Sequence, residues 1–221
     1  MLGATLPLQA AVIVSLEDEP PAASKILSTF SGPSTGNIAW HQSSSTSYRS
    51  VAFAFQIKDA GLLNEIGVYL ANSKGGANMN FSLTLRKSTS VPTSANPLTE
   101  GTLVGNFTGQ IDVAQTAGIL KFDLGENLSV AAGEYYTVIL NWTGTADANK
   151  HFNILYGDDS SAVSAGSWDA TNGGSWVRRD SRDYLFYAAT QIPEPSTVVL
   201  LGLPAFALGL HRWRKSRAPR L

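Results

Sequence analysis

Tyr135-Tyr136-Thr137-Val138-Ile139-Leu140-Asn141-Trp142 is a run of mostly β-branched, aromatic and aliphatic residues. Such residues favour extended strands, in which successive side chains point to opposite faces of a sheet. Tyr136, Val138 and Leu140 would share one face with Trp142, and the other face is also largely apolar. Because both faces need cover, the run predicts a strand in the centre of a sheet rather than at its edge.

Alternation of side-chain character continues on both sides of this run. Residues 81–86 read Phe-Ser-Leu-Thr-Leu-Arg, with one apolar face and one polar face. Further strand-like runs occupy residues 51–57, 64–70, 119–124, 152–156 and 183–188. Turn-forming clusters separate them at residues 73–76, 116–118, 131–134 and 171–174. Many short strands without a helical period predict an all-β body, a two-sheet antiparallel sandwich that is jelly-roll-like.

The composition excludes several kinds of chemistry. The 221-residue chain has no cysteine, which rules out disulfides, thiolate catalysis and cysteine-bound metals. Only 15% of the residues are charged, and Ser, Thr, Asn and Gly are plentiful, as in secreted β-proteins. A body of about 190 residues can bury a sizeable core without cross-links. We therefore expect a single domain that uses no cofactor.

The C-terminal region differs in kind from the body. Residues 196–210 carry no charge and are mostly apolar. As a helix they would extend about 22 Å, a short span for a hydrocarbon core of about 30 Å. The last 11 residues carry a net charge of +5, against −6 for the rest of the chain. This pattern predicts a C-terminal transmembrane helix, with a buried core element of a soluble domain as the alternative.

A basic end can also indicate nucleic acid, but the adjacent apolar run favours a membrane as the partner. The positive-inside rule would place the basic end in the cytoplasm and the body on the other side of the membrane. The residues that would orient the helix are Arg212, Trp213, Arg214, Lys215 and Arg217.

A proline-flanked motif, Pro193-Glu194-Pro195, stands just before the apolar run. The motif, the apolar run and the arginine-rich end together resemble the PEP-CTERM sorting signal of Gram-negative, exopolysaccharide-producing bacteria. The resemblance implies that an exosortase, a membrane-embedded cysteine peptidase, processes the chain near Pro193, Glu194 and Pro195. It also implies an inner-membrane anchor in the precursor and a cell-surface or extracellular location after processing.

The N-terminal residues have two possible roles, a signal peptide or a first strand. Residues 2–14 are mostly apolar but lack a basic start, which favours a partial signal peptide followed by an acidic, proline-containing linker. The alternative is a first strand at residues 11–16. The predicted organisation is a partial signal peptide and linker (1–24), a β-sandwich domain (25–190) and the sorting signal (191–221).

The body carries a resemblance of its own. The segments that carry it are residues 48–55, 66–70, 81–85, 91–98 and 128–138. In this order they are similar to the bacterial choice-of-anchor extracellular β-sandwich domains, which occur with several alternative C-terminal anchors. The resemblance implies a fold and an extracellular setting, and it supplies no catalytic residues.

The body holds few residues suited to catalysis or metal binding. His41 and His151 form no metal-ligand spacing, and no nucleophile motif accompanies them. Asp158, Asp159 and Asp183 are weak candidates for calcium, or for the carboxylates of a glycan-active hydrolase. The alternative for these acids is ordinary solvated loops. We expect no catalytic residue and no bound metal.

Three tryptophans are candidates for glycan contact. Trp168 and Trp176 stand in a run of small residues that suggests a loop, and Trp40 has Asn, His and Gln nearby. An exposed indole offers a sugar ring a flat apolar face. The alternative is that these side chains cover the open ends of the sandwich.

The sequence therefore predicts an exported bacterial surface or extracellular-matrix protein with a non-catalytic β-sandwich, sorted by an exosortase. A carbohydrate-binding module for exopolysaccharide is the first alternative, and a glycan-active hydrolase is the second.

Overall fold

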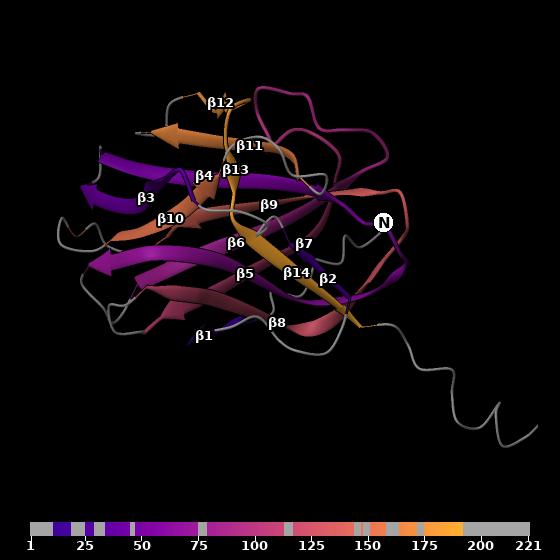
Figure 1. Cartoon of the computed structure of the whole chain (residues 1–221), viewed down its shortest axis with the longest axis horizontal. Coiled ribbons are helices and arrows are strands. Elements are labelled where there is room, and N and C mark those ends of the chain that lie inside the picture. Colours follow the sequence, from indigo (N-terminus) through magenta and orange to yellow (C-terminus); the bar gives the residue numbers. More distant parts are fainter. Residues whose placement is uncertain are drawn as a thin grey trace, which may run out of the picture. The chain divides into compact units, whose positions relative to one another are not determined.

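The computed structural model describes residues 11–18, 25–28, 34–44, 47–74, 79–112, 117–143, 147, 151–157, 164–171 and 175–191. In these residues the regular elements are fourteen strands of one sheet (Figure 1). The strands are β1 (Ile13–Glu17), β2 (Lys25–Ser28), β3 (Gly36–Ser44), β4 (Ser47–Gln56), β5 (Gly61–Lys74), β6 (Met79–Ser88), β7 (Thr102–Ile111), β8 (Gly118–Val130), β9 (Tyr135–Trp142), β10 (His151–Gly157), β11 (Ser164–Thr171), β12 (Val177–Arg178), β13 (Asp183–Tyr184) and β14 (Phe186–Gln191).

The sheet is antiparallel and nearly closes on itself. Its main path runs β1-β8-β5-β10-β3-β4-β9-β6-β7. At the two ends of this path, the Val12 amide next to β1 donates a hydrogen bond of 3.0 Å to the Thr108 carbonyl of β7. The all-β, antiparallel character that the alternation predicts is thus confirmed.

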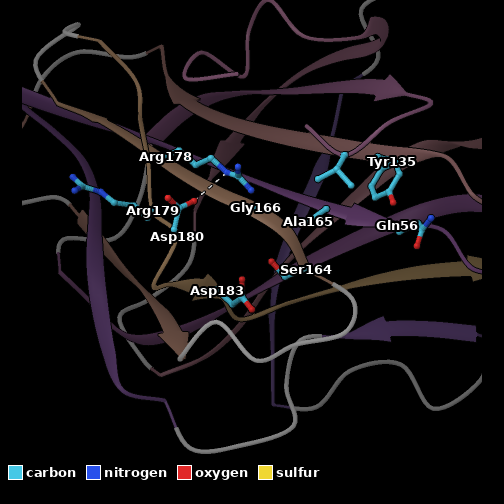
Figure 2. Close-up of a pocket in the computed structure, with 10 residues that line it drawn as sticks. Gln56, Tyr135, Ser164, Ala165, Gly166, Arg178, Arg179, Asp180 and Asp183 are labelled. Carbon is cyan, nitrogen blue, oxygen red and sulfur yellow. Dashed lines mark ion pairs between the residues drawn. The ribbon is translucent and has the colours of Figure 1, made fainter. Parts of the chain in front are cut away.

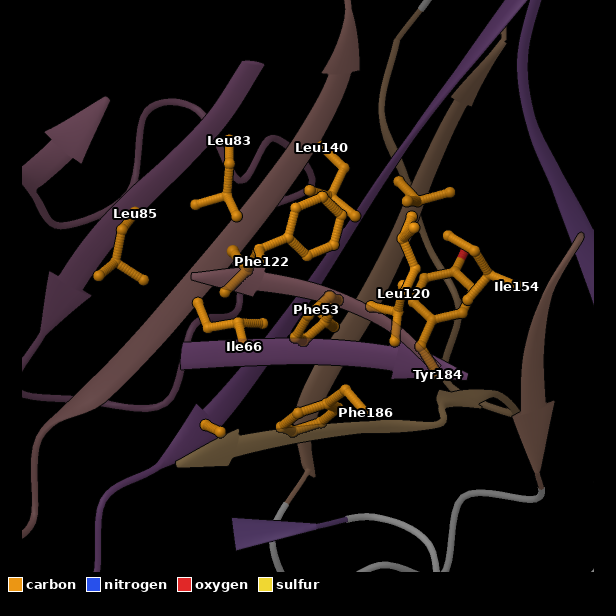
Figure 3. Packing of buried hydrophobic residues seen from close by; sticks show 14 of the residues in the cluster. Phe53, Ile66, Leu83, Leu85, Leu120, Phe122, Leu140, Ile154, Tyr184 and Phe186 are labelled. Atoms are coloured by element: carbon orange, nitrogen blue, oxygen red, sulfur yellow. The ribbon is translucent and has the colours of Figure 1, made fainter. Parts of the chain in front are cut away.

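The largest of the buried apolar clusters fills the space that the curled sheet encloses. Phe53 of β4 stacks on Phe186 of β14 with ring centroids 4.5 Å apart, as Figure 3 shows. Phe81 of β6 meets Phe122 of β8 edge to face at 5.2 Å. Strands that do not pair with each other therefore face each other across this core, and burial of these rings stabilises the fold.

β9 occupies the central position that its sequence predicts, between β4 and β6. Leu140 lies opposite Val51 on one neighbour and Leu83 on the other. The odd face of β9 is covered as well, because Ile139 packs in a second buried cluster with Trp168. The apolar character of both faces is explained by these two clusters.

The last strand-like run, 183–188, is not one strand. β13 pairs with β10, whereas β14 pairs with β5 and β2. At Leu185 the chain changes partners: its amide donates to the Leu155 carbonyl, and its carbonyl accepts from the Tyr69 amide, each at 2.9 Å. Alternation records which side a residue faces and carries no information about such a change of neighbour.

The body begins earlier than residue 25. β1 pairs with β8 over five residues, from Ile13 opposite Asp123 to Glu17 opposite Ile119. Val12 is buried in the main core. The alternative of a first strand at residues 11–16 therefore describes this segment, which the predicted organisation assigns to the signal peptide and linker. Residues 1–10 lie outside the described part of the chain.

Within the described residues, no helix has the length and apolar character needed to cross a membrane. Residues 192–221, with the predicted transmembrane segment, lie outside the described part of the chain.

Candidate functional site

A polar pocket of about 250 Å³ lies where β11 and β12 meet the ends of β4 and β9 (Figure 2). Several separate segments contribute to its wall, and most of the side chains that line it are polar. The lining residues are Gln56, Val91, Tyr135, Ser164, Ala165, Gly166, Arg178, Arg179, Asp180 and Asp183.

A β-bulge shapes the β11 side of the pocket. Ser164 pairs with Phe55 and Gly166 pairs with Ala54, so Ala165 is an additional residue on β11. Gly166 has a φ of +145°, and a Cβ there would lie 2.6 Å from the Trp168 Cη2. Glycine is needed here because both the backbone conformation and the close indole exclude a side chain.

The loop between β6 and β7 lies beside this bulge and is held by hydrogen bonds. Its Glu100 carboxylate accepts hydrogen bonds from the amides of Thr93 (3.0 Å) and Ser94 (2.8 Å). The Ser94 carbonyl in turn accepts a 2.9 Å hydrogen bond from the Trp168 indole. Trp168 thus ties the loop to β11, and Val91 of the same loop reaches the pocket.

The two neighbouring arginines have different electrostatic partners. Arg179 donates from Nε and from Nη2 to the two oxygens of Asp169, whose side chain is only 3% exposed. The hydrogen bond to Asp169 is the main reason why the pKa of Arg179 is raised. The charge of Arg179 is therefore neutralised by a buried carboxylate.

Arg178 is directed differently. Its Nε lies 3.4 Å from Oδ1 of Asp180, and Figure 2 shows these two side chains pointing toward each other. The guanidinium carbon also lies 5.7 Å from the centroid of the Trp168 ring, a cation–π distance. These contacts hold a positive group at the pocket wall.

The pocket offers hydrogen-bond donors and acceptors together. The amide of Gln56, the hydroxyls of Tyr135 and Ser164 and the guanidinium of Arg178 can bind oxygen atoms. Asp183, 2% exposed, adds a carboxylate that already has an interaction partner. Asp180 is 80% exposed and paired with Arg178, unlike the desolvated acid that donates a proton in glycoside hydrolysis.

The predicted glycan-contact residues lie inside the protein. Trp40 and Trp168 are fully buried, and Trp176 is 9% exposed. Trp40 stacks on Trp142 at 4.8 Å, and Trp168 lies in the middle of β11 rather than in a loop. The expectation that these indoles are exposed is therefore wrong, and their burial is what the alternative, in which they cover the open ends of the sandwich, requires.

Other predicted residues fall outside the described part of the chain. These are Asp158, Asp159, Pro193, Glu194, Pro195, Arg212, Trp213, Arg214, Lys215 and Arg217. Asp183, the third calcium candidate, lies in the short strand β13. Among the described residues, no three His, Asp or Glu side chains form a group that could hold a metal ion.

Sequence reasoning missed the pair of Arg179 and Asp169. The available signal was a lone acid between Trp168 and Ala170 in an otherwise uncharged strand, since a buried acid requires a partner. The adjacent Arg178 and Arg179 were the nearest cations downstream, but only the β11–β12 pairing brings them to Asp169.

Comparison with known proteins gives no assignment: no protein-family model and no curated protein matches the chain.

Proposed function

We propose that the chain is an exported bacterial surface or extracellular-matrix protein, sorted through a PEP-CTERM signal by an exosortase. The body would be a non-catalytic, two-sheet, jelly-roll-like sandwich, anchored in the inner membrane by a C-terminal helix before processing. One observation carries this proposal: Pro193-Glu194-Pro195, an uncharged apolar run and an arginine-rich end follow each other in that order.

Two features of the body support the proposal. It builds its sheet and core without disulfides, as an exported chain lacking cysteine must. Its last strand, β14, ends at Gln191, two residues before Pro193. Because the described strands all end before the motif begins, cleavage at the motif would leave every described strand in the body.

The experiment is to produce the full chain in two otherwise identical strains, one with and one without an active exosortase. Mass spectrometry of the exported protein should find a C-terminus near the motif only where the peptidase is active. Glu194→Ala should retain the tail, whereas Glu126→Ala, an exposed acid of the body, should be processed normally. Recovery of an intact chain through Leu221 from the cell exterior would contradict the proposal.

A second candidate function, binding of an exopolysaccharide sugar unit, is favoured by the polar pocket rather than by the tryptophans. Its volume of about 250 Å³ lies below the ~300–1,000 Å³ usual for drug-sized ligands, so it suits one small group. Mixed donors and acceptors fit a ring of hydroxyls.

A glycan array with purified protein tests this second function. Arg178→Ala should weaken binding roughly tenfold or more, because a charged donor is lost. Lys58→Gln, which removes an exposed charge outside the pocket lining, is the matched control. If the protein binds no glycan, or if both variants bind equally well, the pocket is not a sugar-binding site.

A further inference from the structure

Basic residues occupy adjacent register positions across neighbouring strands. His151 of β10 lies directly opposite His41 of β3, and His41 lies directly opposite Arg49 of β4. Lys74 of β5 takes the next register position, opposite His151. Figure 1 shows β5 ending, and β3 turning into β4, at the same end of the body. Residues directly opposite in antiparallel strands have Cβ atoms about 4.5–5.5 Å apart, and like charges there repel.

Two nitrogen atoms in this row are buried and lack hydrogen bonds. They are Nδ1 of His41 and Nε of Arg49. A guanidinium N–H withdrawn from water without an acceptor is costly, and such groups usually indicate a missing partner. The pKa of His41 is lowered first by burial and then by the positive charges of Arg49 and His151. The surroundings of His41 are therefore short of negative charge.

The nearby carboxylates do not supply that charge. The groups that act on the buried Tyr184 hydroxyl are Asp169, Arg182, Arg49 and Arg179, three cations and one anion. The Asp169 carboxylate already accepts two hydrogen bonds from Arg179. The Asp183 carboxylate next to Tyr184 already has an interaction partner. Within the described residues, Arg49 and His41 are left facing each other with no carboxylate paired to either.

We propose that His41 and Arg49 form a binding site for an oxyanion, a carboxylate or phosphate group, on one face of the paired strands β3 and β4. The Nε–H and one terminal N–H of an arginine match two oxygens of such a group side by side. The Nδ1 atom of His41 supplies a third donor when it carries a proton. An anion here accepts a hydrogen bond from the unpaired Nε of Arg49 and, once His41 is protonated, from its Nδ1. This site is separate from the pocket and does not depend on the sorting signal.

The test follows thermal unfolding and the imidazole NMR signals of the full chain in a buffer that contains only chloride. Inorganic phosphate and glucuronate are then added at constant ionic strength. A ligand that binds the folded state raises the unfolding temperature by mass action, and an anion beside His41 raises the pKa of its imidazole. A response to either ligand supports the site, and the two ligands distinguish phosphate from carboxylate recognition.

Arg49→Met keeps most of the apolar stem and removes the guanidinium, so the variant is expected to fold. It should bind about tenfold more weakly or worse, because the charged side-on pair is lost. Without added oxyanion it should be at least as stable as the parent protein, since it removes an unpaired buried donor. Lys58→Gln should bind like the parent protein. The proposal is overturned if phosphate and glucuronate leave His41 and the unfolding temperature unchanged, or if both variants weaken binding equally.

Discussion

The Asp169 carboxylate shows how one buried charge constrains its surroundings. It lies on β11 with its side chain 3% exposed, and Arg179 donates a hydrogen bond to each of its two carboxylate oxygens. Removing one partner of a buried pair leaves the other charge without compensation, which costs far more than the pair itself contributes. Arg178, the preceding residue, makes an ion pair with Asp180, a side chain that is 80% exposed.

This contrast predicts unequal effects of the same substitution at adjacent positions. Arg179→Met should lower the free energy of unfolding by about 2 kcal/mol, less than for a fully enclosed pair, because the Arg179 side chain is 36% exposed. Arg178→Met should cost at most about 1 kcal/mol, as expected for surface pairs. Urea unfolding at neutral pH measures both. Equal losses would mean that Asp169 obtains its compensation elsewhere.

His41 predicts a pH dependence of stability. Its pKa in the folded protein is lowered, mainly by burial, so the unfolded chain binds the proton more readily. Stability is then fully present above the unfolded pKa of about 6.5 and declines as pH falls toward the folded value.

Urea unfolding of the parent protein and His41→Gln between pH 7.5 and 5 in chloride buffer isolates this contribution. The parent protein should lose more stability than the variant over this interval. If the two curves run parallel, burial does not penalise protonation of His41.

At the scale of elements, β5 and β14 make an unusually close contact. The ring of Tyr187 lies over Gly67, where a Cβ would come within 2.0 Å of Cε1. Tyr187 is fully buried, and its hydroxyl donates to Glu65 of β5. The glycine therefore allows an aromatic side chain of one strand to lie flat on the next.

Gly67→Ala should destabilise the body by about 1–3 kcal/mol, because an added methyl group in a filled space forces the ring to move. Gly133→Ala is the comparison: nothing lies within 4 Å of its Cβ, so only its positive φ of +84° should cost about 1 kcal/mol. Replacing Tyr187 with Leu should suppress the excess cost at Gly67. Equal costs at the two glycines would contradict the steric explanation.

Strand existence could be predicted from sequence far better than strand partners. Alternation of side-chain character predicts β9 and β6, because it depends only on neighbouring residues. The small residues around Trp168 predict a loop, although β11 pairs with β4 over most of its length. The pocket joins segments from residue 56 to residue 183, so its membership depends on pairings that no local pattern records.

At the scale of the whole molecule, the last strand of the described sheet ends at Gln191. β14 makes its last pair with β5 there, opposite Leu62. Phe186, Tyr187 and Ala188 of β14 are fully buried. The compact unit formed by the body ends at the same residue.

A chain ending at Gln191 should therefore fold, with a free energy of unfolding within about 0.5 kcal/mol of the full chain. A chain ending at Leu185 lacks β14 and should not fold, because β5 and β2 lose their shared neighbour. Dispersed amide NMR signals and urea unfolding provide the readouts. Marked loss of stability in the longer truncation would show that residues after Gln191 contribute to the body.

The sequence by itself determined the all-β character of the body and its central strand β9. It also determined that a Pro-Glu-Pro motif, an apolar run and a basic end follow one another along the C-terminal residues. These are properties of residues that are close together along the chain, read from a period of two or from a run of like residues. The tertiary structure alone decided that Trp40 and Trp168 are buried, that Arg179 meets Asp169, and that His41 and Arg49 face each other. Those outcomes depend on which strands pair and in what register, and pairing is set by the packing of the whole core.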